Sequence, residues 1–147
     1  WWYTVQELDR QAGVWRQLVG DRVPDMGYYG DFEEAALTNA KCEQFLLAAD
    51  GHFSTITGGY FGLGWANPRQ PLTWARHPSG VLRPLWLGQW NWADAPTLPE
   101  PWASEGGYTC WQWICTGGVA GFPKRVCLDR YNGTWSDLLA LYGPLGS

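Results

Sequence analysis

The strongest constraint on the fold of this chain is the order of its strand-like and helix-like segments. Strands and helices alternate up to Thr57, whereas the later strands follow one another with no regular helix between them. Strands that alternate with helices are typical of parallel βαβ units, whose helices pack in layers on a sheet. The sequence therefore predicts an α/β fold.

Capping signals and apolar periodicity predict the helices. Residues 4–7 have the capping-box pattern, and apolar residues then recur at helical spacing up to Gly20. Residues 39–50 carry an apolar face and precede Gly51, so a second helix is expected there. A third helix is expected to begin at residues 134–137.

Runs of β-branched and aromatic residues predict the strands. These runs are residues 1–3, 28–31, 53–57, 85–90, 108–114 and 125–131. Gly58 and Gly59 are expected to end the third strand, and residues 62–82 are expected to form a long loop with one helical turn. A proline-rich loop is expected over residues 95–101.

The length of the chain bounds the architecture. A complete parallel (β/α) barrel takes about 250 residues, and this chain has 147. We therefore expect a TIM-type barrel that is incomplete at its N-terminal side, with no regular helices between the last strands. Because open sheet edges leave backbone groups unpaired, the missing N-terminal segment is expected to come from another chain or a swapped copy.

Charge and hydropathy exclude two classes of partner. Asp and Glu number 14 against 10 Lys and Arg, and the basic residues form no cluster, so a nucleic-acid partner is not expected. The apolar runs are only a few residues long, so no membrane-spanning helix is expected. The chain has 12 Trp, which either form a surface that stacks on sugars or fill the core.

The cysteines favour neither a metal site nor a cofactor. The four cysteines lie at positions 42, 110, 115 and 127, and they form no CxxC pair. Cys115 and Cys127 flank a glycine-rich connection between two strands, so they either bridge a hairpin or remain small buried thiols. We expect no metal and no cofactor.

The candidate catalytic pair is Asp31 and Glu33. In a strand, residues two apart point to the same face with Cα atoms about 6.5–7 Å apart. Two such carboxylates can divide the roles of general acid and charge stabiliser. With Glu34 next in the chain, the same acids also fit the start of a helix. Cys42 with a histidine base is a competing chemistry, which no local signature supports.

Several stretches in order resemble the glycoside hydrolase family 25 lysozymes, which cut bacterial cell-wall glycan. The matching stretches are residues 11–12, 29–33, 84–91, 111–113, 118–121 and 126–133. The resemblance covers most of residues 1–142, the expected domain, and only the later part of the family's barrel. Residues 143–147 match a protease-site remnant used in expression and are set apart.

The resemblance implies an enzyme that cleaves the β-1,4 links of peptidoglycan by acid catalysis. It implies Glu33 as the general acid and Asp31 as the residue that stabilises positive charge or orients the substrate. It also implies substrate-binding residues: Trp86, Trp90, Trp111, Trp113 and Asp129. The implied partner is a peptidoglycan glycan chain, and the implied location is extracellular or phage-associated.

The closing motif departs from the family pattern at two positions. Cys127 stands where the family has Asp, and Asp129 stands where it has Asn. A related group of glycoside-hydrolase-like domains shares the fold and varies these residues. The alternative function is therefore a non-catalytic glycan-binding or structural domain on the same fold.

Overall fold

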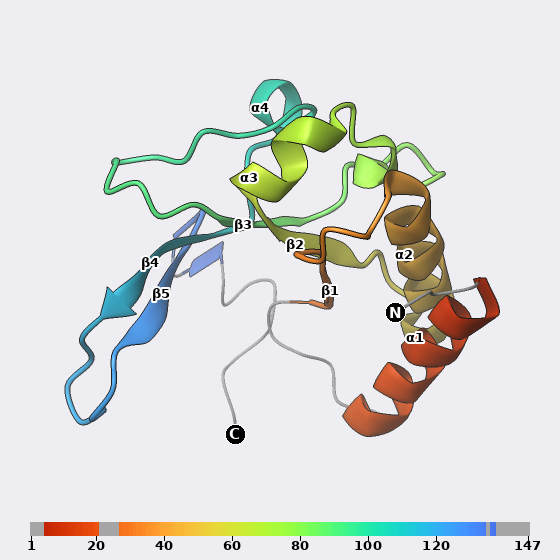
Figure 1. Ribbon diagram of the computed structural model, residues 1–147, viewed down its shortest axis with the longest axis horizontal. Coiled ribbons are helices and arrows are strands. Elements are labelled where there is room, and N and C mark those ends of the chain that lie inside the picture. Colours follow the sequence, from red (N-terminus) through yellow and green to blue (C-terminus); the bar gives the residue numbers. More distant parts are fainter. Residues whose placement is uncertain (1–4, 21–26, 135, 138–147) are drawn as a thin grey trace.

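The computed structural model describes residues 5–20, 27–134 and 136–137 (Figure 1). These residues form a five-stranded sheet in the order β1-β2-β3-β4-β5, in which β1 to β4 are parallel and β5 is antiparallel to β4. The strands are β1 (Tyr29–Asp31), β2 (Gly58–Gly62), β3 (Leu85–Gly88), β4 (Cys110–Gly117) and β5 (Val126–Tyr131). The α/β class is confirmed, and the sheet formed by the described strands is open.

The two long helices begin as the sequence predicts. Helix α1 (Val5–Val19) ends at Gly20, whose φ of +64° is readily adopted by glycine and whose N–H donates to the Arg16 carbonyl. Helix α2 (Asn39–Phe53) follows Thr38, whose hydroxyl accepts a hydrogen bond from the Lys41 N–H. The two helices pack against each other beside the sheet.

The predicted strand over residues 53–57 is wrong, and so is the expected helix end at Gly51. Helix α2 continues through Gly51 to Phe53 and ends at Ser54, which has a φ of 54°. The strand lies instead across the two glycines that were expected to break it. A Cβ at Gly59 would lie 2.7 Å from the Trp74 ring, so this strand packs closely because it lacks side chains there.

The segment from 62 to 82 has more structure than one helical turn. It contains α3 (Leu63–Ala66), η1 (Asn67–Arg69) and η2 (Thr73–Ala75). The Arg69 guanidinium orders it by donating to the backbone carbonyls of Ala35, Leu37 and Trp65. A further short helix, α4 (Trp102–Glu105), follows the proline-rich loop and was not expected from the sequence.

The core lies between the sheet and the helices on one side of it. Figure 1 shows α3 and α4 above the sheet and α2 at its right. The buried residues of this core come from the strands, the helices and the loops between them: Phe32, Cys42, Leu46, Phe61, Ala66, Leu72, Trp74, Ala75, Leu85, Leu87 and Trp102. Within the described ranges, no helix is long and apolar enough to cross a membrane.

The four cysteines divide into a bridge and two thiols. Cys115 and Cys127 form a disulfide across the β4–β5 hairpin, whereas Cys42 and Cys110 are free and buried. Of the two interpretations left open for Cys115 and Cys127, the hairpin bridge is confirmed. The predictions for residues 1–3, for the final helix beyond residue 137 and for the remnant at 143–147 lie outside the described residues.

Candidate active site

One face of the sheet carries a row of polar and aromatic side chains, one from each strand. Asp31 pairs with Tyr60, Tyr60 with Trp86, and Gln112 with Asp129. Gly88, two residues beyond Trp86, pairs with Gln112, so all five side chains project from the same face. This face is opposite the one that packs on the helices, where Phe61, Leu85 and Leu87 are buried.

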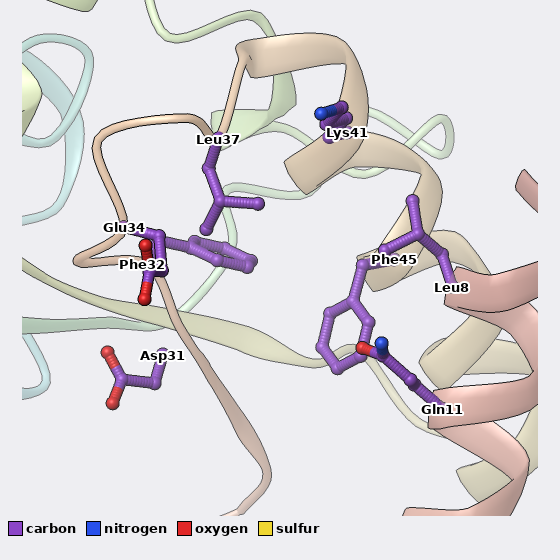
Figure 2. Close-up of a pocket in the computed structure, with 8 residues that line it drawn as sticks. All are labelled: Leu8, Gln11, Asp31, Phe32, Glu34, Leu37, Lys41 and Phe45. Atoms are coloured by element: carbon purple, nitrogen blue, oxygen red, sulfur yellow. The ribbon is translucent and has the colours of Figure 1, made fainter. Parts of the chain in front are cut away.

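Asp31 and Glu33 lie close together but line different cavities. Strand β1 ends at Asp31, so the two-residue alternation expected for Asp31 and Glu33 does not extend to Glu33. Asp31 lines a cavity of about 150 Å³ between α1, α2 and the segment after β1 (Figure 2). Glu33 lines a second cavity of about 300 Å³, together with Tyr60, Gln89 and Trp90. The sequence had predicted that both carboxylates project into one space.

The surroundings of the carboxyl groups near this face raise their pKa values. Burial raises the pKa of Glu33, and the negative charge of Asp31 raises it further. Burial also raises the pKa of Asp31 and that of Asp129, although the hydrogen bond from Trp86 opposes the rise at Asp129. Burial and then the charges of these carboxylates raise the pKa of Tyr60 to about 12, so its hydroxyl remains a donor.

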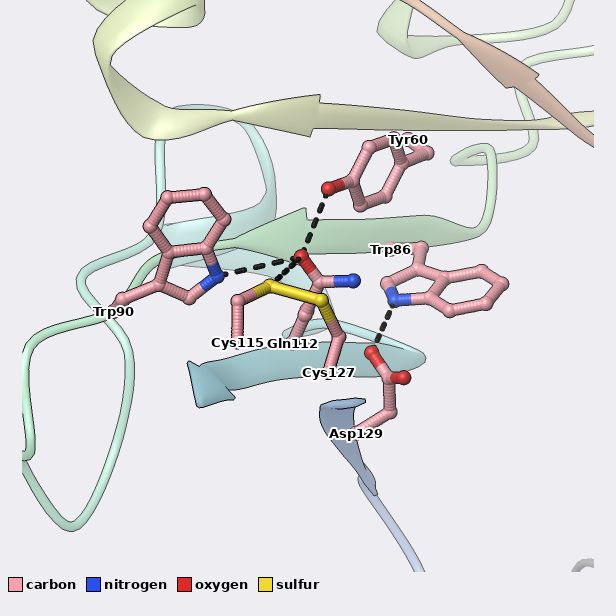
Figure 3. Close-up of a disulfide and its surroundings, with 7 residues drawn as sticks. All are labelled: Tyr60, Trp86, Trp90, Gln112, Cys115, Cys127 and Asp129. Atoms are coloured by element: carbon pink, nitrogen blue, oxygen red, sulfur yellow. Dashed lines mark hydrogen bonds between the residues drawn. A yellow bond between two sulfur atoms is a disulfide. The ribbon is translucent and has the colours of Figure 1, made fainter. Parts of the chain in front are cut away.

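The structure brings two of the four predicted substrate-binding tryptophans to this face. The Trp86 indole N–H donates to Asp129 Oδ1 at 2.8 Å (Figure 3). Trp90 lines the Glu33 cavity and is 60% exposed, so its ring is available to a ligand. The Trp86 ring also makes edge contacts with Tyr29 and Tyr60, which hold it in place.

The other two tryptophans, Trp111 and Trp113, lie on the opposite face. Trp111 is fully buried, and its indole N–H donates to the Gln89 carbonyl. The Arg130 guanidinium lies 5.3 Å from the Trp111 ring centroid and 4.3 Å from that of Trp113, so one cation contacts both rings. The expectation that these two rings form a sugar-binding wall beside Trp86 is corrected: Trp111 is a core residue, and Trp113 packs against Arg130.

Sequence reasoning missed two residues of the site, Tyr60 and Gln112. The Tyr60 hydroxyl donates to Gln112 Oε1 at 3.0 Å, and the Trp90 indole N–H donates to the same oxygen at 3.3 Å (Figure 3). Tyr60 was missed because its strand was placed five residues too early. A signal for Gln112 did exist, because it is the polar residue between two tryptophans in a strand and must take the face opposite to theirs.

The competing cysteine chemistry finds no support in the geometry. Burial raises the pKa of Cys42 and of Cys110 to about 12, which suppresses the thiolate form that acts as a nucleophile. The other two cysteines are joined in the disulfide. In the described part of the chain, no group of three or more His, Cys, Asp or Glu side chains could hold a metal ion.

Comparisons with known proteins relate the sequence and fold of this chain to lysozymes. No family model matches the sequence. Lysozyme M1 of Streptomyces globisporus is 36% identical over 58 residues, which are 40% of this chain and 18% of that protein. A bacterial lysozyme of Streptomyces coelicolor has a similar structure, with a TM-score of 0.68 and 20% identity, over 92% of this chain and 65% of that one.

A second solved structure has a similar fold. The glycosyl hydrolase 25 GHIP of Streptococcus pneumoniae superposes with a TM-score of 0.69 and 16% identity, over 95% of this chain and 60% of that one. This chain therefore spans less than two thirds of the length of these solved relatives. The likeness establishes a glycoside hydrolase 25-like fold for the described residues.

Proposed function

We propose that this chain is part of a lysozyme-like glycoside hydrolase that cleaves the β-1,4 links of peptidoglycan. Glu33 is the general acid that protonates the glycosidic oxygen, and Asp31 stabilises the positive charge that develops on the sugar. Trp86, Trp90 and Asp129 contact the glycan. The domain acts on the cell wall, outside the cell or as part of a phage.

The position of Glu33 carries this proposal. Its carboxyl group lies just beyond the carboxyl end of a parallel strand, where α/β sheets place their active sites, and it lines an aromatic cleft beside Asp31. Burial and the neighbouring Asp31 charge both raise its pKa, which keeps a general acid protonated at higher pH. The lysozymes that share this fold support the same chemistry.

A non-catalytic glycan-binding domain is the second candidate. The observation that favours it is the disulfide, because Cys127 stands where the resembling family has an Asp and is bonded to Cys115. A carboxylate of the family pattern is then absent from β5. Asp129, two residues further along the same strand, supplies a carboxylate on the same face.

Hydrolysis of purified peptidoglycan distinguishes the two candidates. We expect incubation with the protein to release new reducing ends, and mass spectrometry to find muramic acid at those ends. Binding to peptidoglycan without any new reducing ends would instead support the non-catalytic domain.

The pH dependence of activity provides a separate test of the acid. Glu33 must be protonated to act, so activity should fall as pH rises through its raised pKa. Asp31→Asn removes the negative charge that helps to raise this pKa. We expect the alkaline limb of the pH–rate profile to shift to lower pH in this variant. An alkaline limb that stays at the parent's pH would show that Asp31 does not control the ionisation of the acid.

We also propose that further strands complete this sheet into a barrel. In the described residues β1 and β5 are the edge strands, and each has one neighbour. Edge strands leave backbone N–H and C=O groups ready to pair with another strand. A further segment would supply the strands that pair with these two edges. Light scattering after size exclusion tests this, and a cooperatively melting 16.6 kDa monomer would contradict it.

A further inference from the structure

The Gln112 side chain is held in one orientation by Tyr60 of β2 and by Trp90, which follows β3. Its Oε1 accepts a hydrogen bond from the Tyr60 hydroxyl at 3.0 Å and another from the Trp90 indole N–H at 3.3 Å. Cys115 Sγ lies 3.3 Å from the same oxygen. Because a disulfide sulfur carries no proton, it packs against this oxygen and does not donate to it.

The carbonyl end of this amide is therefore fully used. An amide oxygen has two lone pairs, and Tyr60 and Trp90 occupy both. Rotating the amide by half a turn would bring its NH₂ group against the Trp90 indole N–H, which can only donate. In Figure 3 the Nε2 end points away from Trp90, toward the side on which Trp86 and Asp129 lie. No described residue accepts a hydrogen bond from Nε2.

The other donors around this amide are already engaged. The Trp86 N–H is bound to Asp129, and the Tyr60 hydroxyl and the Trp90 N–H are bound to Gln112 itself. Most of the remaining polar groups on this face are carboxylates, which accept hydrogen bonds when ionised. Among the residues of Figure 3, Gln112 Nε2 is thus the neutral N–H donor left for a ligand.

We propose that Gln112 is a specificity-determining residue that donates from Nε2 to the carbonyl oxygen of a substrate acetamido group. This inference rests on the proposed function, because it takes the ligand to be an N-acetylated glycan. An N-deacetylated sugar carries an ammonium group there, which offers no acceptor. The site then discriminates against the deacetylated glycan because the fixed amide donor is left unpaired.

Two variants of Gln112 separate this donor role from its role in packing. Gln112→Met removes both ends of the amide without adding charge. Gln112→Glu keeps an acceptor for Tyr60 and Trp90 but cannot donate when ionised. Gln44→Glu on the exposed side of α2 is the matched control for the added charge. Circular dichroism and thermal melting establish that each variant is folded.

The readout is kcat/KM on peptidoglycan before and after chemical N-deacetylation. We expect the parent and Gln44→Glu to prefer the N-acetylated glycan. Both Gln112 variants should lose about 10- to 100-fold in kcat/KM on the N-acetylated glycan, mainly through KM, with little loss on the deacetylated one. A folded Gln112→Glu protein that keeps the parent's preference would overturn the inference.

A parent that hydrolyses neither glycan would refute the proposed enzymatic function but would still leave the inference testable. Calorimetry with an N-acetylglucosamine tetramer then measures binding alone. Weaker binding by Gln112→Glu, with binding by Gln44→Glu unchanged, would support the donor role. Equal binding by Gln112→Glu and Gln44→Glu would overturn it.

Discussion

Replacing Glu33 with Gln is expected to abolish most of the peptidoglycan hydrolysis. The amide is nearly the same size as the carboxyl group, but its NH₂ group is too weak an acid to protonate the glycosidic oxygen. General acid catalysis contributes about 10²- to 10⁴-fold to a rate, so kcat should fall by at least about 100-fold. Binding should persist, because Tyr60, Gln89 and Trp90 still line the same cavity. Release of reducing ends and cosedimentation with peptidoglycan measure the two effects separately.

The adjacent Glu34 offers a matched control for this substitution. Glu34 lines the other cavity, with Asp31 and Lys41, and not the cavity that Glu33 lines (Figure 2). Glu34→Gln makes the same chemical change one residue along the chain and should retain hydrolysis. Equal rates for Glu33→Gln and the parent would exclude Glu33 as the acid. Equal losses in both variants would point to a general effect on the segment after β1.

The second large effect is expected at a buried ion pair remote from this chemistry. Arg83 is 1% exposed, and its guanidinium donates to both carboxylate oxygens of Asp50, at 3.1 and 2.7 Å. It also donates to the Thr57 carbonyl, and the Arg83 carbonyl accepts from the Trp102 indole. These contacts tie α2 and α4 to the residues that precede β2 and β3.

Arg83→Met should therefore destabilise the fold strongly. The variant leaves the Asp50 carboxylate with one fewer charged partner in a largely buried position. Breaking a buried pair by removing one partner costs about 3–5 kcal/mol, and net domain stability is only about 5–15 kcal/mol. Urea unfolding followed by tryptophan fluorescence measures the change in the free energy of unfolding.

Arg76 provides the control for the loss of an ion pair as such. Its guanidinium pairs with Glu105, and both side chains are more than a third exposed. Exposed pairs contribute about 0–1 kcal/mol, so Arg76→Met should change stability little. A similar small change in Arg83→Met would mean that solvent reaches the Arg83 pocket and that the network does not hold the strand ends together.

Local signals in the sequence determined several elements of the fold. The capping pattern at residues 4–7 and the stop at Gly20 predicted α1 with its bounds. The apolar runs predicted β3, β4 and β5 to within a few residues, because each run is bounded by turn residues. The sequence placed the Asp31–Glu33 pair at the end of a strand, and in the structure Asp31 is the last residue of the parallel strand β1, with Glu33 just beyond it. This is the edge at which such sheets bind ligands.

Strand β2 depended on tertiary structure. Gly58 and Gly59 disfavour a strand by propensity, and the sequence therefore predicted a break there. In the fold these glycines allow the Trp74 ring and the Pro84 carbonyl to come close to the strand, and this packing outweighs the local preference. Because the strand was misplaced, the position of Tyr60 on the site face could not be predicted.

The tertiary structure also decided which face of the sheet Trp111 and Trp113 take. Alternation along residues 111–113 puts Gln112 on the face opposite to the two tryptophans, and the structure has it there. The pattern does not say which face meets the helices, because an aromatic residue suits both a core and a sugar site. Packing against Arg130 and the Gln89 carbonyl buries Trp111, and the same register turns Gln112 toward Tyr60 and the site.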